Sequence, residues 1–385
     1  MEALILSCGT GGGHNAAGYA VKEELERRGH NVKMLDPYTL KGNHIDRLID
    51  NAYIKLVQRV PLAFGAVYGL GNLYRRLPFR SPVYFLNRKM VPVMERLLSE
   101  KQYDYVVMPH LYPAEILTYM KNHGYHVPKM LFIATDYTCI PFTEETECDT
   151  YVIPSDKLTR EFVKRGVSKD RLLPLGIPVR REFAQPFDRL EVAARLGLDS
   201  KLHYILITGG SIGAGKLVRA VKVLDRRYHK DGTVKLIVIC GNNRRLYHKL
   251  HEQYGERHII LQRTEQMPDY VKLCDVMVIK PGGLSSTEAA VTGKRLVLMT
   301  PIPGCESHNL HFFRKNGLCR GVLTPDIQLV KEVDRLMKQS DDCEMTRRQH
   351  AVINTRAVED ICDFMEQFQK RNPNLFVFSS HLHMD

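Results

Sequence analysis

The stretch VMVIKPGGLSSTEAAVTGKRLVLMTPIPGCESHN, residues 276–309, decides the fold of this chain. Its apolar start predicts a short strand over Val276–Ile279, which runs into a Lys-Pro-Gly-Gly turn and a helix that opens with Ser285 and Ser286. A second strand is predicted over Leu296–Met299, before a loop rich in proline and glycine. The pattern brings two strand ends and one helix start close together.

This arrangement suits a phosphate ester. The first turn of a helix carries unpaired N–H groups and a partial positive charge, and a glycine-rich approach lets a phosphate reach them. Glu288, one turn into the helix, could accept hydrogen bonds from a ribose diol. The stretch therefore predicts a nucleotide site.

Length and composition indicate a globular protein. The chain has 385 residues, 44% of them hydrophobic and 25% charged, which is enough for two domains with cores of their own. No apolar run approaches the roughly 18 residues that a membrane-spanning helix needs. The first residues, MEALILSCGTGGG, lack the basic leader of a signal peptide.

The cysteines indicate the redox compartment of the protein, and the net charge indicates the kind of partner it binds. The nine cysteines show no metal-ligand spacing, so we expect reduced cytosolic thiols and no metal site. The net charge of +12 implies an anionic partner.

The chain begins with a predicted βαβ unit. Strands are expected over Ala3–Ser7 and Val32–Leu35, with a glycine loop at Gly9–Gly13 and a helix over Ala16–Arg28 between them. Gly9 and Gly11 begin a G-x-G-x-x-G pattern, so a dinucleotide fold is an alternative.

The sixth position of that pattern argues against a dinucleotide. It is His14 instead of glycine, and Asp36, where a ribose acid would stand, is followed by a proline typical of a turn. An imidazole at a helix start beside a glycine loop is well placed for proton transfer. A structural role for His14, capping the loop, stays open.

Residues 45–99 are basic and aromatic. They hold nine Lys or Arg against three Asp or Glu, with seven aromatic residues interleaved. Such a pattern suits the surface of an anionic membrane. A pair of core helices with a basic outer face is an equal alternative. A nucleic-acid surface is a further one, although no known nucleic-acid-binding module accompanies the charge.

Two polar residues follow later strands of the first domain. His110 comes after a strand predicted over Tyr105–Met108, and Asp136 after one over Lys129–Ala134. Open α/β sheets bind ligands at this edge. Asp136 could orient or deprotonate a hydroxyl, or cap a turn. Gly176–Val179 is a predicted linker.

A second α/β series begins near Tyr204. Its first strand ends in GGSIGAGKL, in which Gly210, Gly215 and Lys216 have P-loop spacing. The next residue is Leu217, so the hydroxyl that would hold Mg²⁺ in an NTPase is missing. The glycines are better suited to admit a diphosphate without a metal.

Together these motifs resemble the GT-B glycosyltransferases. The GGGH loop at residues 11–14, the Thr-Asp pair at 135–136 and the pattern PGG…E…PxPG…N over 281–309 resemble monogalactosyldiacylglycerol synthases and processive diacylglycerol glucosyltransferases, relatives of MurG. The resemblance runs from Ile5 to about Phe368. It implies two Rossmann-like domains facing across a cleft, with an N-terminal acceptor and membrane domain over 1–178 and a donor domain over 179–371. The last helix could pack back on the first domain, and 372–385 is a tail without an interpretation.

The resemblance also implies site residues. His14, helped by Asp136, is the candidate base. The implied acceptor site comprises Gly12, Gly13, His110 and Tyr137. The implied donor site comprises Gly210, Ser211, Gly241, Met267, Gly283, Leu284, Ser285, Glu288, Glu306 and Asn309.

The expected reaction is an inverting transfer of a hexose from a UDP-sugar to diacylglycerol or a glycosyl-diacylglycerol at the cytoplasmic face of the membrane, with no metal. One position departs from the family: PGQE reads Pro303-Gly304-Cys305-Glu306 here, which leaves the donor sugar open. A transferase for a polyprenyl-linked or soluble acceptor, a UDP-sugar epimerase and a non-catalytic UDP-sugar sensor remain alternatives.

Overall fold

The structure is a computed structural model that describes residues 1–8, 12–41, 69, 71, 74, 79–210 and 216–371. Most of the basic segment 45–99, Ser211 and the tail lie outside the described residues.

The N-terminal half is built on one parallel sheet. Its strands lie in the order β2-β1-β3-β4-β5-β6. All neighbouring strands are parallel, and β1 pairs with both β2 and β3. The strands are β1 (Glu2–Leu6), β2 (Asn31–Leu35), β3 (Tyr105–Met108), β4 (Lys129–Ile133), β5 (Thr150–Val152) and β6 (Leu172–Leu173).

Helices connect these strands, because a parallel pair needs a long crossover. The helices are α1 (Gly12–Arg27), α4 (Pro82–Asn87), α5 (Val91–Glu100), α6 (Leu111–Asn122) and α7 (Thr159–Lys164). Strands β3 and β4 are apolar and buried along nearly their whole length, as expected of a sheet covered on both faces.

The C-terminal half repeats this architecture. Its sheet has the order β12-β11-β10-β7-β8-β9, again parallel throughout, and β10 lies between β7 and β11. The strands are β7 (His203–Thr208), β8 (Val234–Ile239), β9 (Ile259–Leu261), β10 (Val276–Ile279), β11 (Arg295–Leu298) and β12 (Arg320–Gly321). The helices are α8 (Arg189–Leu196), α9 (Leu217–Tyr228), α10 (Arg244–Tyr254), α11 (Met267–Leu273), α12 (Gly283–Val291), α13 (Cys305–Lys315), α14 (Ile327–Met337), α15 (Glu344–Val352) and α16 (Ala357–Arg371).

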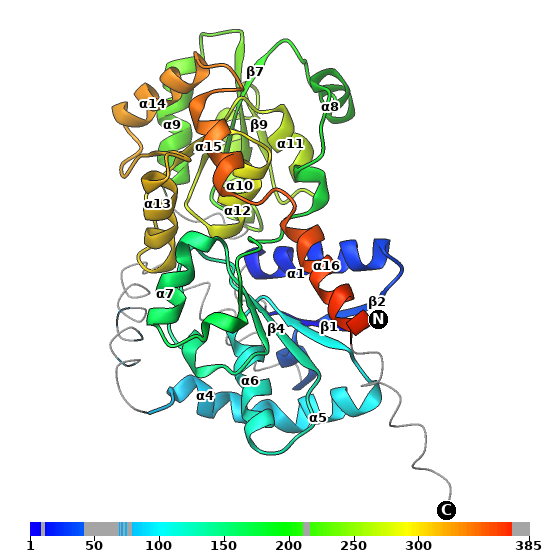
Figure 1. Cartoon of the computed structure of the whole chain (residues 1–385). Coiled ribbons are helices and arrows are strands. Elements are labelled where there is room, and N and C mark those ends of the chain that lie inside the picture. The colour runs from blue at the N-terminus through cyan, green and yellow to red at the C-terminus, as the bar shows by residue number, and fades with distance from the viewer. Residues whose placement is uncertain are drawn as a thin grey trace, which may run out of the picture.

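The last helix returns to the first domain. In Figure 1, α16 leaves the upper half and lies across α1 of the lower half. Val358, Ile361 and Met365 of α16 share a buried apolar cluster with Ile5 and Leu25 of the N-terminal half. The chain therefore passes between the halves twice, near Gly176 and again before α16.

The second crossing is tied to the first by a hydrogen bond. Asn354 donates its Nδ2 proton to the Leu175 carbonyl at 2.8 Å. Gly176 has a φ of 99° and lies so close that an added Cβ would sit 3.1 Å from the Cβ of Ala357. Only glycine accepts this combination of backbone angle and space readily.

The predicted α/β class and the two Rossmann-like halves are confirmed. The first helix begins at Gly12, four residues earlier than predicted, so His14 lies within its first turn. The helix of 276–309 likewise begins at Gly283 instead of Ser285. Among the described residues, no helix has the length and apolarity required to cross a membrane.

Candidate active site between the two domains

The His14 side chain bonds to two groups that follow strands of the first sheet, a backbone carbonyl after β3 and a hydroxyl after β4. Its Nδ1 lies 2.8 Å from the Pro109 carbonyl oxygen and 2.8 Å from Thr135 Oγ1. A carbonyl oxygen can only accept, so the bond to Pro109 places the imidazole proton on Nδ1. Nε2 is then the atom of His14 that can accept a proton.

The surroundings favour the neutral form of this imidazole. Burial lowers the pKa of His14, while the Asp136 carboxylate and the Pro109 carbonyl partly offset that shift. A histidine with a lowered pKa is deprotonated at neutral pH and is therefore available as a general base.

His110 lies directly beside His14. The two rings meet edge to face with centroids 4.7 Å apart. His110 is buried and caps α6, where its Nδ1 accepts a hydrogen bond from the Tyr112 amide at 3.2 Å. Burial, together with the adjacent His14, holds the pKa of His110 well below its usual value. Its placement gives it a role in supporting α6 and His14.

Asp136 is bonded across the domain interface. Asn309 of α13 donates from Nδ2 to Asp136 Oδ1 at 2.7 Å and to the Pro281 carbonyl at 3.0 Å. The same amide accepts from the Tyr137 backbone N–H at 2.7 Å. Asn309, expected to bind the sugar, thus connects the Thr-Asp pair to the C-terminal half in this structure.

Tyr137 is a domain-interface residue. Its side chain is buried and its hydroxyl forms a 2.7 Å hydrogen bond with Thr287 of α12. Its ring stacks on Phe312 with centroids 4.6 Å apart and meets Phe313 edge-on. The resemblance implied an acceptor contact for Tyr137, and in the structure its side chain packs the two halves together.

The start of α12 lies against the first domain. Gly283 is so close to the 135–136 backbone that an added Cβ would be 1.9 Å from the Thr135 carbonyl oxygen. Gly13 approaches Leu284 in the same region, where an added Cβ would be 3.7 Å from the Leu284 Cβ. The N-terminal N–H groups of α12, at Gly283, Leu284 and Ser285, are therefore next to the loop that carries His14. Gly12 begins α1 in that loop.

Glu288 is a half-buried carboxyl one turn further along α12. Burial raises its pKa to about 8, an effect that Arg180 partly opposes. No hydrogen bond of its carboxyl group to another described residue is recorded, so it is able to take a ligand hydroxyl. The proximity of Arg180 was not foreseen from the sequence.

Glu306 is already paired on both oxygens. Lys280 Nζ lies 2.5 Å from Oε1, and the Ile302 amide donates to Oε2 at 2.8 Å. Burial is the largest single effect on the pKa of Lys280 and lowers it, but the charge and hydrogen bond of Glu306, together with Cys305 and Asp136, leave the pKa raised. The ion pair fixes the loop that precedes α13. Lys280 was not predicted as a site residue, although a residue directly after a parallel strand, such as β10, lies at the edge of the sheet where ligands bind.

The remaining donor candidates lie at the ends of the second sheet. Gly210 follows β7 with a φ of 74°, and Gly241 follows β8 with a φ of 60°. An added Cβ on Gly210 would sit 3.0 Å from Lys280 Cε, so the Gly210 backbone closely approaches the Lys280–Glu306 pair. Met267 begins α11. The structure thus places Gly210, Gly241 and Met267 after or near carboxyl ends of strands, where doubly wound sheets bind ligands.

Comparison with known proteins agrees with this architecture. Residues 14–179 match the family described as monogalactosyldiacylglycerol (MGDG) synthase, and residues 204–363 match the glycosyltransferase family 28 C-terminal domain. The structure is similar to that of MurG from Acinetobacter baumannii, with a TM-score of 0.59, 15% identity and coverage of 95% of this chain and 99% of MurG. Two Rossmann-like domains that meet at the start of α12 define a GT-B glycosyltransferase fold.

Sequence relatives identify the branch of that fold. The processive diacylglycerol beta-glucosyltransferase of Bacillus pumilus is 22% identical over 90% of this chain and 89% of its own length. The chloroplastic monogalactosyldiacylglycerol synthase of spinach is 24% identical over 87% of this chain and 65% of its own length. The chain belongs to the GT-B family of monogalactosyldiacylglycerol synthases and processive diacylglycerol glucosyltransferases.

Proposed function

We propose that this protein transfers a hexose from a UDP-sugar to diacylglycerol, or to a glycosyl-diacylglycerol, at the cytoplasmic face of the membrane. The product would be a β-glycolipid. The family membership supports the lipid acceptor, and the nine cysteines, none of them in a disulfide, fit a reducing compartment. The single observation that carries the chemistry is His14, whose Nδ1 is bonded to Pro109, beside the N-terminus of α12.

The reaction would be one inverting displacement. The acceptor oxygen attacks the anomeric carbon as the bond from that carbon to the UDP oxygen breaks, and the hydroxyl proton passes to His14 Nε2. Asp136 favours the imidazolium that forms, since its charge raises the pKa of His14. Negative charge that develops on the diphosphate would be stabilised by the N–H groups at the start of α12, without a metal.

Domain contact would protect the donor from hydrolysis. The interface formed by Asn309, Asp136, Tyr137 and Thr287 brings the two halves together beside His14. Closure of this kind excludes water from the reacting atoms. Glu288 would accept the ribose hydroxyls, because its carboxyl is half-buried and has no hydrogen-bond partner among the residues that the structure describes.

The decisive experiment is incubation of the protein with labelled UDP-glucose, UDP-galactose or UDP-N-acetylglucosamine and vesicles containing diacylglycerol, followed by analysis of the lipids. We expect a labelled glycosyl-diacylglycerol with one donor, and His14→Ala should abolish it while UDP binds as before. Label released only as free sugar, or carried only to a polyprenyl or soluble acceptor, would contradict the lipid assignment. Binding of UDP-sugar without turnover would indicate a sensor.

A further inference from the structure

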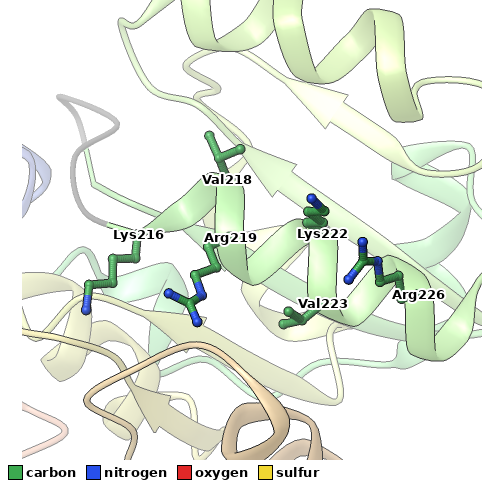
Figure 2. Close-up of a pocket in the computed structure, with 6 residues that line it drawn as sticks. All are labelled: Lys216, Val218, Arg219, Lys222, Val223 and Arg226. Atoms are coloured by element: carbon green, nitrogen blue, oxygen red, sulfur yellow. The ribbon is translucent and has the colours of Figure 1, made fainter.

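Helix α9 carries a row of exposed cations on its outer face. Lys216, the N-cap residue, and Arg219, Lys222 and Arg226 within the helix are all solvent-exposed and recur at spacings of three or four residues, so they follow one side of α9. They border an open hollow of about 560 Å³. Figure 2 shows these basic side chains along the helix. We call these four residues the α9 basic face.

The charge of this face is not balanced by acids. No ion pair with a carboxylate is recorded for any of the four side chains within the part of the chain that the structure describes; Lys216 Nζ lies near only the Leu323 carbonyl, at 3.4 Å. The nearby carboxylates form ion pairs with other basic residues. Asp334 pairs with Arg227 at 3.1 Å, and Asp225 with Arg257 at 3.2 Å. Four positive charges therefore face solvent together.

Valines accompany these cations. Val218 and Val223 are half-buried, pack against the core and border the same hollow. Their exposed area is small, so the face has little apolar surface to insert into hydrocarbon. Ten residues of helix span roughly 15 Å. The face is thus a short, straight row of cations along the border of the hollow, and such a row can lie against a layer of negative charge.

We propose that the α9 basic face docks on anionic phospholipid headgroups of the bilayer. The inference rests on the proposed function, since an acceptor that lies in a membrane requires the protein to approach it. Anionic lipids attract exposed Lys and Arg side chains near the surface, and the attraction fades within a Debye length. This contact lies on the donor domain and is separate from the basic segment 45–99 of the first domain. Contacts on both halves would hold the two domains at the membrane.

The test is charge reversal on this face. Lys216 is left unchanged because it borders the glycine loop expected to meet the diphosphate, and the variant is Arg219→Glu, Lys222→Glu and Arg226→Glu. A control variant reverses three exposed cations of the same domain that are spread over separate segments, Lys201, Lys249 and Arg347. Both variants change the net charge equally.

Vesicle flotation measures the effect. With phosphatidylcholine vesicles that contain phosphatidylglycerol, we expect the α9 variant to partition at least tenfold more weakly than wild type, and the control variant to stay within about twofold. Wild-type binding should weaken with salt and vanish on pure phosphatidylcholine. Equal losses in both variants, or none in the α9 variant, would overturn the proposal. Loss of duplex-DNA binding with vesicle binding intact would assign the face to nucleic acid instead.

Turnover in neutral detergent separates this inference from the proposed function. With a short-chain diacylglycerol in uncharged micelles, both variants should match the wild-type rate, which also shows that they are folded. The α9 variant should lose activity only on anionic vesicles. If the wild-type protein shows no turnover in micelles, the transferase assignment is contradicted. The vesicle-flotation result would then still show whether the α9 basic face binds anionic lipid.

Discussion

Asn309 and Asp136 are joined across the two domains by a 2.7 Å hydrogen bond, although 173 positions separate them in the chain. The Asn309 side chain is fully buried and uses both ends of its amide, since Oδ1 also accepts from the Tyr137 N–H. One side chain of the C-terminal half therefore bonds to the Thr-Asp segment of the N-terminal half.

Removing this amide should weaken the interface. In Asn309→Ala the Tyr137 N–H loses its partner inside a buried contact, and an unsatisfied buried group costs about 1–3 kcal/mol. We expect a lower midpoint of chemical denaturation and a reduced kcat. Asn316→Ala is the control, because the Asn316 side chain, at the C-terminal cap of α13, donates to the Phe312 carbonyl of that helix and, among the described residues, to no group of the other half. If the denaturation midpoint of Asn309→Ala is as high as that of Asn316→Ala, the cross-domain hydrogen bond does not contribute to stability.

Gly283 and Gly282 form a matched pair for testing domain contact. A Cβ at Gly283 would meet the Thr135 carbonyl oxygen at 1.9 Å, whereas one at Gly282 would meet nothing within 4 Å. Gly282 also has a φ of −72°, which any residue adopts. Gly283→Ala should push the halves apart and reduce turnover at least 100-fold, and Gly282→Ala should keep most of the activity. A larger radius of gyration of Gly283→Ala in solution scattering would locate the cause; equal activity of the two variants would refute it.

The pH dependence of turnover tests His14. Because burial lowers its pKa below the ordinary value of 6.5, the base is already deprotonated at pH 7. The acid limb of kcat/KM should therefore lie below pH 6.5, with no further gain from this group above pH 7. His14→Gln should lose roughly 10²–10⁴-fold in kcat and lack that limb. An acid limb that persists in the variant would assign it to another group.

Much of the fold was predictable because both sheets are parallel and buried. Strands such as Val276–Ile279 are short apolar runs next to glycine turns, and this local sequence pattern is enough to predict a buried parallel strand. His14 and Glu288 were each predicted near a helix start, although the two helices begin four and two residues earlier than predicted.

The cross-domain contacts were not predictable in this way. No local sequence pattern encodes how the two halves meet. That geometry determines the Asn309–Asp136 hydrogen bond, the burial of Tyr137 and the close approach of Gly283 to the Thr135 carbonyl. The Lys280–Glu306 pair likewise needs two strand ends in register. The cations of α9 were visible at helical spacing, but only the structure shows that neighbouring acids serve other partners.

Glu288 should make nucleotide binding depend on pH. Its pKa of about 8 means that the carboxyl is largely protonated at pH 7 in the free protein. A ribose diol donates two hydrogen bonds and so favours the carboxylate, which means that binding releases a proton and tightens as pH rises through 8. With that pKa, linkage predicts about tenfold stronger UDP binding at pH 9 than at pH 7.

The isosteric amide provides the control for this linkage. Glu288→Gln cannot titrate, so calorimetry of UDP binding should show a nearly flat affinity and no proton release over the same range. The substitution also removes a carboxyl whose raised pKa makes stability fall as pH rises between about 4.5 and 8. The variant should therefore be relatively more stable than wild type at pH 8.5. An unchanged pH dependence of UDP affinity in Glu288→Gln would exclude Glu288 from the ribose site.

Cys305 is the position at which donor choice can be tested. It begins α13 beside Asp136, and burial, reinforced by Asp136 and Glu306, raises the pKa of its thiol well above the usual value. A neutral thiol is a weak hydrogen-bond donor, whereas the glutamine that resembling enzymes carry here offers an amide donor and acceptor. Cys305→Gln should therefore change KM for the UDP-sugar and the ranking of donor hexoses, with little effect on the Kd of UDP itself. Competition assays with UDP-glucose and UDP-galactose measure the ranking; a change in UDP affinity with the ranking intact would place Cys305 away from the sugar.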